Sequence, residues 1–321
     1  MNKKIVLALG GNALIKEGQK GTIPEQYVNA YKALKHVSEL IKRGYKIAIT
    51  HGNGPQVGAI IIRDEADNTS YDLPLSVAVA QSQGEIGLII TQTLKNQLMT
   101  NGINRDVATI LTHVVCDKND PSMKNPTKPI GPFYKTSNTF REKGISFIED
   151  SGRGYRRVVP SPMPLDIIEK ETIKLLVDRG VIVVAVGGGG IPVYITKKGK
   201  IESIDGVVDK DLASYVLADC IKADQLIILT YVEKVALNFN KPNQKWLDHI
   251  TVKEAKKYLK EGHFPPGSME PKIKSAIHFL ENGGKRVIIT SIDKLPEAMK
   301  GKTGTHITSN TFILPRTKFH T

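Results

Sequence analysis

Short apolar runs that end in glycine or a small polar residue recur along this chain and alternate with amphipathic segments. This alternation limits the fold more than any other feature. The runs are rich in valine and isoleucine, as strands buried on both faces of a sheet usually are. The clearest runs span residues 3–11, 45–54, 106–115, 180–190, 224–232 and 285–291.

The segments between these runs have the spacing of apolar residues that is typical of helices. Several of them are followed by a glycine, which commonly ends a helix. The predicted helices span residues 26–43, 75–101, 166–179, 210–221 and 271–282. Together the two patterns predict an α/β fold, with a mostly parallel open sheet sandwiched by helices.

Composition and charge argue against nucleic acids and membranes as binding partners. The net charge is +13, but the lysines are interleaved with glutamate along helical segments and aromatic residues make up only 6%. This distribution indicates solvated helix faces rather than a nucleic-acid surface. The chain shows no leader and no run of about 18 apolar residues that would span a membrane. We therefore expect a soluble, cytoplasmic protein without nucleic-acid or membrane partners, in which Cys116 and Cys220 stay unpaired.

The segment 117–157 interrupts the alternation. It contains prolines at positions 121, 126, 129 and 132 and has weak periodicity. Irregular segments of this length in a compact domain are usually functional or form an inserted unit. We expect a small protruding subdomain here, within an N-terminal half of residues 1–183. A C-terminal half of residues 184–309 follows, and residues 310–321 form a tail to which we assign no role.

Glycine-rich turns follow three of the predicted strands. Glycine permits positive φ and lets backbone N–H groups surround an anion. In parallel sheets, ligands bind at the carboxyl ends of the strands, where these turns fall. The turns consist of Gly10, Gly11 and Asn12, of Gly52, Asn53 and Gly54, and of Gly187, Gly188, Gly189 and Gly190.

Familiar nucleotide motifs fit these turns poorly. Residues 52–58 resemble a dinucleotide fingerprint, but the glycine spacing is off by one and no strand ending in a carboxylate follows at the required distance. A nicotinamide-dependent oxidoreductase is thus disfavoured. Residues 301–303 imitate the end of a Walker A loop, although Pro296 stands where its first glycine belongs. A basic binding protein without enzymatic activity stays open as an alternative.

Charged residues gather where the helix of residues 210–221 is predicted to begin. Asp205, Asp209 and Asp211 surround Lys210 there. The carboxylates can cap the helix and interact with its dipole. Alternatively, the lysine between them can meet a nucleotide phosphate or its magnesium ion. The preceding residues 191–204 alternate around a polar turn, which predicts a β-hairpin.

Blocks of residues along nearly the whole chain resemble the carbamate kinases of the amino-acid kinase superfamily. The blocks are ALGGNAL (8–14), THGNGPQVG (50–58), NPTKPIGPFY (125–134), VVPSPMP (158–164), VGGGGIPV (186–193), VVDKDLAS (207–214), VALNFNKPNQ (235–244) and GSMEPKIKSAIHFL (267–280). The resemblance implies an amino-acid kinase fold and reversible phosphoryl transfer between ATP plus carbamate and ADP plus carbamoyl phosphate. It also implies a homodimer. Another small-acid kinase of this fold, such as an acetylglutamate or glutamate kinase, is the alternative.

The resemblance also implies roles for individual residues. The superfamily usually carries a lysine before the first pair of glycines, where this chain has Ala8. Since phosphoryl transfer needs cations around the transferring group, Lys128 on a mobile lid and Lys210 are expected to replace it. Asp209 and Asp211 are expected to orient these lysines and the magnesium ion, which arrives with ATP or ADP and needs no dedicated protein ligands.

The resemblance also implies that different glycine-rich turns bind the two substrates. Carbamate or carbamoyl phosphate is expected at Gly10, Gly11, Asn12, Gly52, Asn53 and Gly54. The nucleotide is expected at Gly187, Gly188, Gly189, Gly190, Lys210, Tyr231 and Lys272.

Overall fold

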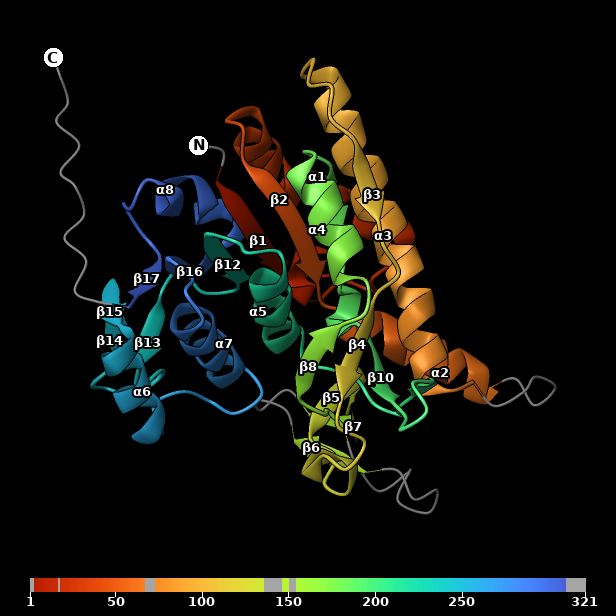
Figure 1. Ribbon diagram of the computed structural model, residues 1–321. Coiled ribbons are helices and arrows are strands. Elements are labelled where there is room, and N and C mark those ends of the chain that lie inside the picture. Colours follow the sequence, from red (N-terminus) through yellow and green to blue (C-terminus); the bar gives the residue numbers. More distant parts are fainter. Residues whose placement is uncertain (1–2, 17, 67–72, 136–145, 150–153, 310–321) are drawn as a thin grey trace, which may run out of the picture.

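The computed structural model describes residues 3–16, 18–66, 73–135, 146–149 and 154–309, without the side chain of Asn12 (Figure 1). A central eight-stranded sheet runs through both halves of the chain in the order β15-β17-β16-β12-β1-β2-β9-β3. Neighbouring strands are parallel except β16 and β17, which confirms the predicted sheet. The strands are β1 (Lys4–Leu9), β2 (Lys46–His51), β3 (Val107–Thr109), β9 (Ile182–Val184), β12 (Gln225–Thr230), β15 (His249–Thr251), β16 (Arg286–Ser291) and β17 (Thr305–Thr308).

Helices cover both faces of this sheet, as Figure 1 shows. Side chains alternate along each strand, so Ile5 and Leu7 of β1 belong to one core cluster while Val6 and Ala8 belong to the other. The first cluster includes α1 (Ile23–Lys42), α3 (Leu75–Thr100) and α8 (Leu295–Met299). The second includes α4 (Lys170–Asp178), α5 (Lys210–Cys220), α6 (Val252–Lys260) and α7 (Met269–Glu281). Ala8 is thus a fully buried core residue beneath α5.

A second sheet, in the order β11-β10-β4-β8, lies beside the main one. It consists of β4 (His113–Cys116), β8 (Pro164–Ile167), β10 (Ile191–Ile195) and β11 (Ile201–Ser203). Strands β10 and β11 are antiparallel, which confirms the predicted hairpin. The single strand predicted over residues 106–115 is wrong, because β3 and β4 lie in different sheets. Gln83 of α3 interrupts the run by binding both backbone groups of Thr112, at 2.9 Å and 3.1 Å.

The interrupting segment forms a three-stranded antiparallel sheet, β5-β7-β6, which we call the lid sheet. Its strands are β5 (Lys128–Tyr134), β6 (Phe147–Glu149) and β7 (Tyr155–Val159). The lid sheet contacts the rest of the protein at β5, which packs directly on α2 (Gly54–Ala66). A Cβ added to Gly58 would lie 1.9 Å from Gly131 Cα, so only glycine allows this backbone contact.

The rest of the described chain completes the C-terminal half. A small antiparallel sheet pairs β13 (Val235–Leu237) with β14 (Lys245–Leu247). The boundary predicted after residue 183 falls inside β9, and the tail of residues 310–321 lies outside the described residues. Among the helices that the structure describes, none is both long and apolar enough to cross a membrane.

Candidate active site

A cavity of about 1030 Å³ opens between the carboxyl ends of β1, β2 and β12, the lid sheet and the N-terminus of α5. Most of the predicted site residues line it. These are Gly11, Gly52, Asn53, Gly54, Lys128, Gly188, Asp209, Lys210, Asp211, Tyr231 and Lys272. The structure therefore brings together residues from seven separate parts of the chain, including both halves and the lid sheet.

Asp209 caps α5 and also binds a lysine. Its Oδ1 accepts hydrogen bonds from the backbone N–H groups of Asp211 at 2.9 Å and Leu212 at 3.2 Å, as an N-cap residue does. Its Oδ2 accepts a hydrogen bond from Lys128 Nζ, which reaches across from the first residue of β5. The Asp209 carboxylate therefore caps the helix with one oxygen and contacts Lys128 with the other.

Asp211 holds two further lysines. Its Oδ1 lies 2.5 Å from Lys210 Nζ, and its Oδ2 lies 3.0 Å from Lys272 Nζ. Lys272 also donates to the backbone carbonyl of Ser268 at 3.0 Å, which fixes the ammonium group. The Asp211 side chain caps nothing in α5, because Asp209 fills that position. Three ammonium groups thus converge on two carboxylates at one end of a helix.

Ion pairing outweighs burial at these carboxylates. Burial raises the pKa of Asp211, but Lys210 and Lys272 lower it well below its usual range. Burial acts in the same direction on Asp209, and the ammonium groups, Lys128 foremost, again hold its pKa below the usual range. Burial lowers the pKa of Lys210 against the attraction of Asp211. The pKa of Lys272 is raised by Asp211 in spite of burial. The cluster carries one positive charge more than negative when all five groups are ionised.

The turn after β2 is held by buried contacts. His51 lies against the Gly187 backbone and is neutral at physiological pH, because burial lowers its pKa to about 4. The Asn53 side chain donates to Ser82 Oγ at 2.8 Å. A Cβ on Gly188 would lie 1.9 Å from Asn53 Nδ2, so Gly188 has to be glycine for this approach. Gly188, which was expected to bind the nucleotide, therefore lies next to the turn that was expected to hold the acceptor.

Several predicted residues do not line the cavity. Gly187, Gly189 and Gly190 are buried, and added Cβ atoms would collide with His51, Val208 and Val114. These glycines permit close packing of the backbone, which sequence alone does not distinguish from anion binding. Gly10 precedes the short 3-10 turn Gly11–Ala13 and does not line the cavity. Asn12 lies in that turn, and its side chain is outside the described residues.

Sequence reasoning missed four cationic side chains that line the cavity: Lys16, Lys20, Arg63 and Arg156. Lys16 and Lys20 belong to the segment between β1 and α1, and Arg63 lies near the end of α2. Only Arg156 carried a signal, since it follows the glycines of the segment that interrupts the α/β alternation. Alternation along β7 would have placed Arg156 and Arg157 on opposite faces.

Among the described residues, no group of three His, Cys, Asp or Glu side chains could hold a metal ion. The carboxylates that line the cavity, Asp209 and Asp211, already bind lysines. This donor set fits a magnesium ion that is held largely by nucleotide phosphates, which is the usual arrangement for that ion.

Comparison with known proteins identifies the group to which this architecture belongs. A model of the amino acid kinase family matches residues 3–291. The chain is 50% identical to the carbamate kinase of Pyrococcus furiosus over 313 residues, which cover 96% of this chain and 99% of that protein. It is also 50% identical to the carbamate kinase of Pyrococcus horikoshii, over 96% of this chain and 100% of that protein.

A solved structure agrees with these relatives. The carbamate kinase from Giardia lamblia bound to AMP-PNP is 41% identical and has a TM-score of 0.88, covering 96% of this chain and 98% of that chain. Identity of 41–50% over nearly the full length of both chains is sufficient to assign the family. The chain therefore belongs to the amino acid kinase family, and within it to the carbamate kinases.

Proposed function

We propose that this carbamate kinase transfers a phosphoryl group between ATP and carbamate through the cluster of Lys128, Lys210 and Lys272. The observation that carries the proposal is the convergence of these lysines on Asp209 and Asp211 inside the cavity. Carbamate already has an anionic oxygen, so no protein nucleophile or general base is required. Positioning and charge neutralisation supply the catalysis.

The position of each lysine supports a division of roles. Lys272 lies in the first turn of α7, in the C-terminal half that also supplies Tyr231 to the cavity, and is assigned to the nucleotide phosphates. The Giardia relative binds AMP-PNP, which supports a nucleotide site in a protein of this fold. Lys128 comes from the lid sheet, on the side of the Gly52–Gly54 turn, and is assigned to the transferring group. Lys210 lies between the two and neutralises charge that develops during transfer.

Magnesium is assigned to the nucleotide. We expect purified protein to form ATP from ADP and carbamoyl phosphate when Mg²⁺ is present, and to lose this activity when a chelator removes the ion. The reason is that Mg²⁺ neutralises the nucleotide phosphates, and the described residues include no group of carboxylates that could hold the ion against a chelator. ATP formation followed with a coupled assay measures the effect, and excess Mg²⁺ should restore it.

Two outcomes would contradict this proposal. ATP formation that continues undiminished in the chelator removes the role of the metal. Rates of phosphorylation are also measured with glutamate and N-acetylglutamate. If either exceeds the rate with carbamate, the protein is another acid kinase of this fold.

We also assign a homodimer that forms through the outer faces of α1 and α3. Large apolar side chains are exposed there, with Tyr31 and Leu88 both 60% exposed and Met99 67% exposed. Light scattering at micromolar concentration is expected to give twice the chain mass of 35.3 kDa. The variant Leu88→Glu should shift the mass toward a monomer. A monomeric mass for the parent protein would refute the assignment.

The proposed location is the cytoplasm. The described thiols, Cys116 and Cys220, are free. Burial raises the pKa of Cys116 to about 12 and that of Cys220 to about 11, so both stay protonated at neutral pH. Unpaired thiols are usual in a reducing compartment, where ATP and ADP are also available.

A further inference from the structure

Arg156 places a guanidinium group at the acceptor end of the cavity. It lies on β7 of the lid sheet and lines the cavity together with Phe133 and Gly54. A Cβ built on Gly54 would lie 3.6 Å from Arg156 Nη2, so this nitrogen stands over the first residue of α2. The first turn of a helix leaves backbone N–H groups without partners inside the helix, and the guanidinium adds a full charge beside them.

Two contacts fix the direction of this side chain. Arg156 Nε donates to the carbonyl of Gly131 at 3.0 Å. The guanidinium carbon also lies 5.1 Å from the centre of the Phe133 ring, where a cation is attracted to the aromatic face. A guanidinium held in this way keeps its plane and its Nη atoms in one orientation, as recognition of a planar oxyanion requires.

The cavity as a whole favours an anion. Lys16, Lys20 and Arg63 line the cavity in addition to Arg156. Among the described lining residues, the acidic ones are Asp209 and Asp211, and both are already paired with lysines. An anion entering beside Gly54 would therefore lie close to the Arg156 guanidinium, in a cavity whose described lining carries more cationic than acidic side chains.

We propose that Arg156 binds the acceptor anion, carbamate or carbamoyl phosphate, and sets the affinity for it. This role rests on the function proposed above and adds a substrate-binding residue to it. Because the contact exists before and during transfer, it acts chiefly on KM and leaves kcat nearly unchanged. Lys128 reaches the transferring group from the neighbouring strand β5, so one sheet supplies both the binding cation and the catalytic cation.

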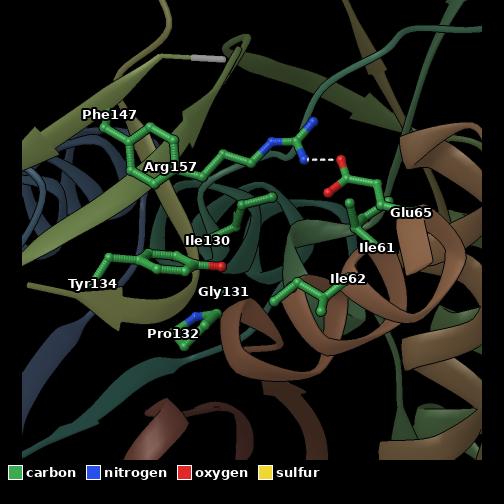
Figure 2. A pocket seen from close by; sticks show the side chains of 10 residues that line it. Ile61, Ile62, Glu65, Ile130, Gly131, Pro132, Tyr134, Phe147 and Arg157 are labelled. Carbon is green, nitrogen blue, oxygen red and sulfur yellow. Dashed lines mark hydrogen bonds and ion pairs between the residues drawn. The ribbon is translucent and has the colours of Figure 1, made fainter. Parts of the chain in front are cut away.

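Arg157 provides a matched control on the same strand. It points to the other face of the lid sheet and binds Glu65 of α2, as Figure 2 shows. There it lines a small pocket with Tyr134 and Phe147 that adjoins the large cavity along β5, but it does not line the large cavity itself. Replacing Arg157 removes the same charge from the same strand without touching the acceptor end.

The test measures steady-state kinetics of ATP formation for Arg156→Gln, Arg156→Lys and Arg157→Gln. Arg156→Gln should raise KM for carbamoyl phosphate about 10- to 100-fold, the effect of a lost charge-assisted hydrogen bond. KM for ADP should stay within about twofold. Arg156→Lys, which keeps the charge and loses the planar fork, should lie between the parent and Arg156→Gln. Arg157→Gln should resemble the parent.

A binding measurement separates this proposal from the reaction itself. Inorganic phosphate should raise the thermal midpoint of the parent and of Arg157→Gln. Arg156→Gln should need about tenfold more phosphate for the same rise in thermal midpoint. The binding comparison can be made even if the parent forms no ATP. That result would overturn the proposed function but not the role of Arg156 in binding an anion. Equal KM values for carbamoyl phosphate in Arg156→Gln and the parent, or equal loss for ADP, would overturn the role of Arg156. If Arg156→Gln does not fold, parental values in Arg156→Lys would overturn it as well.

Discussion

Lys128→Ala is expected to lower turnover by about two orders of magnitude or more, comparable with removing one preorganised donor that stabilises developing charge. KM for ADP should change less than about twofold, because Lys128 lies on β5 and pairs with Asp209, while the nucleotide is assigned to Lys272 and Tyr231. Ala8 is buried in the core, so β1 supplies no cation at this point. Steady-state kinetics in the direction of ATP formation measures both constants.

Lys124→Ala is the control for this variant. Lys124 lies four residues before Lys128 in the same segment, but it is exposed and does not line the cavity. It should leave both kcat and KM near the parental values. Near-parental turnover in Lys128→Ala, or a loss restricted to ADP binding, would show that another residue neutralises the transferring group.

Asp211→Asn is expected to reduce both activity and stability. The change leaves Lys210 and Lys272 close together in a buried place without their shared carboxylate. Removing one partner of a buried ion pair costs about 3–5 kcal/mol in the free energy of unfolding. With both ammonium groups misplaced, turnover should fall by about two to three orders of magnitude. The helix cap should survive, because Asp209 provides it.

Asp219→Asn offers a comparison on the same helix. Asp219 lies near the other end of α5, where its carboxylate accepts a hydrogen bond from Asn282 at 2.5 Å. Kinetics measured well below the thermal midpoint of each variant separate loss of activity from unfolding. If Asp211→Asn turns over like the parent under these conditions, Asp211 does not orient the lysines.

The sequence patterns predicted most strands of the main sheet and most of its helices, because a doubly covered parallel sheet demands continuous apolar strands. They did not predict β15 and β17 at one edge of the sheet, or helix α8. The strands β1, β2 and β12 fall within predicted runs, and α3 begins at Leu75 as predicted. Local signals were sufficient there. The convergence of Lys128, Lys210 and Lys272 was reached through the family resemblance, since these residues lie far apart in the chain and no local pattern joins them.

Failures arose where long-range contacts decide local structure. Helix α2 was not predicted, because glycines at positions 54 and 58 disfavour a helix and Gly58 is required only by its contact with Gly131. The break between β3 and β4 depends on Gln83, which comes from a distant helix. The role of Gly189 and Gly190 in packing likewise becomes visible only beside Val208 and Val114.

Because β1 lies in the middle of the sheet, it stays incompletely paired during synthesis until its second neighbour, β12, has left the ribosome. Its neighbour β2 follows closely, but the contact between Lys4 and Asp224 beside β12 joins residues 220 positions apart. At synthesis rates of about 5–20 residues per second, β12 appears roughly 10–45 s after β1. During that interval one edge of the apolar strand β1 has no partner strand. Its exposed N–H and C=O groups can pair with other chains and lead to aggregation. Translation of the second half, rather than of the first, therefore determines how long the nascent protein needs protection.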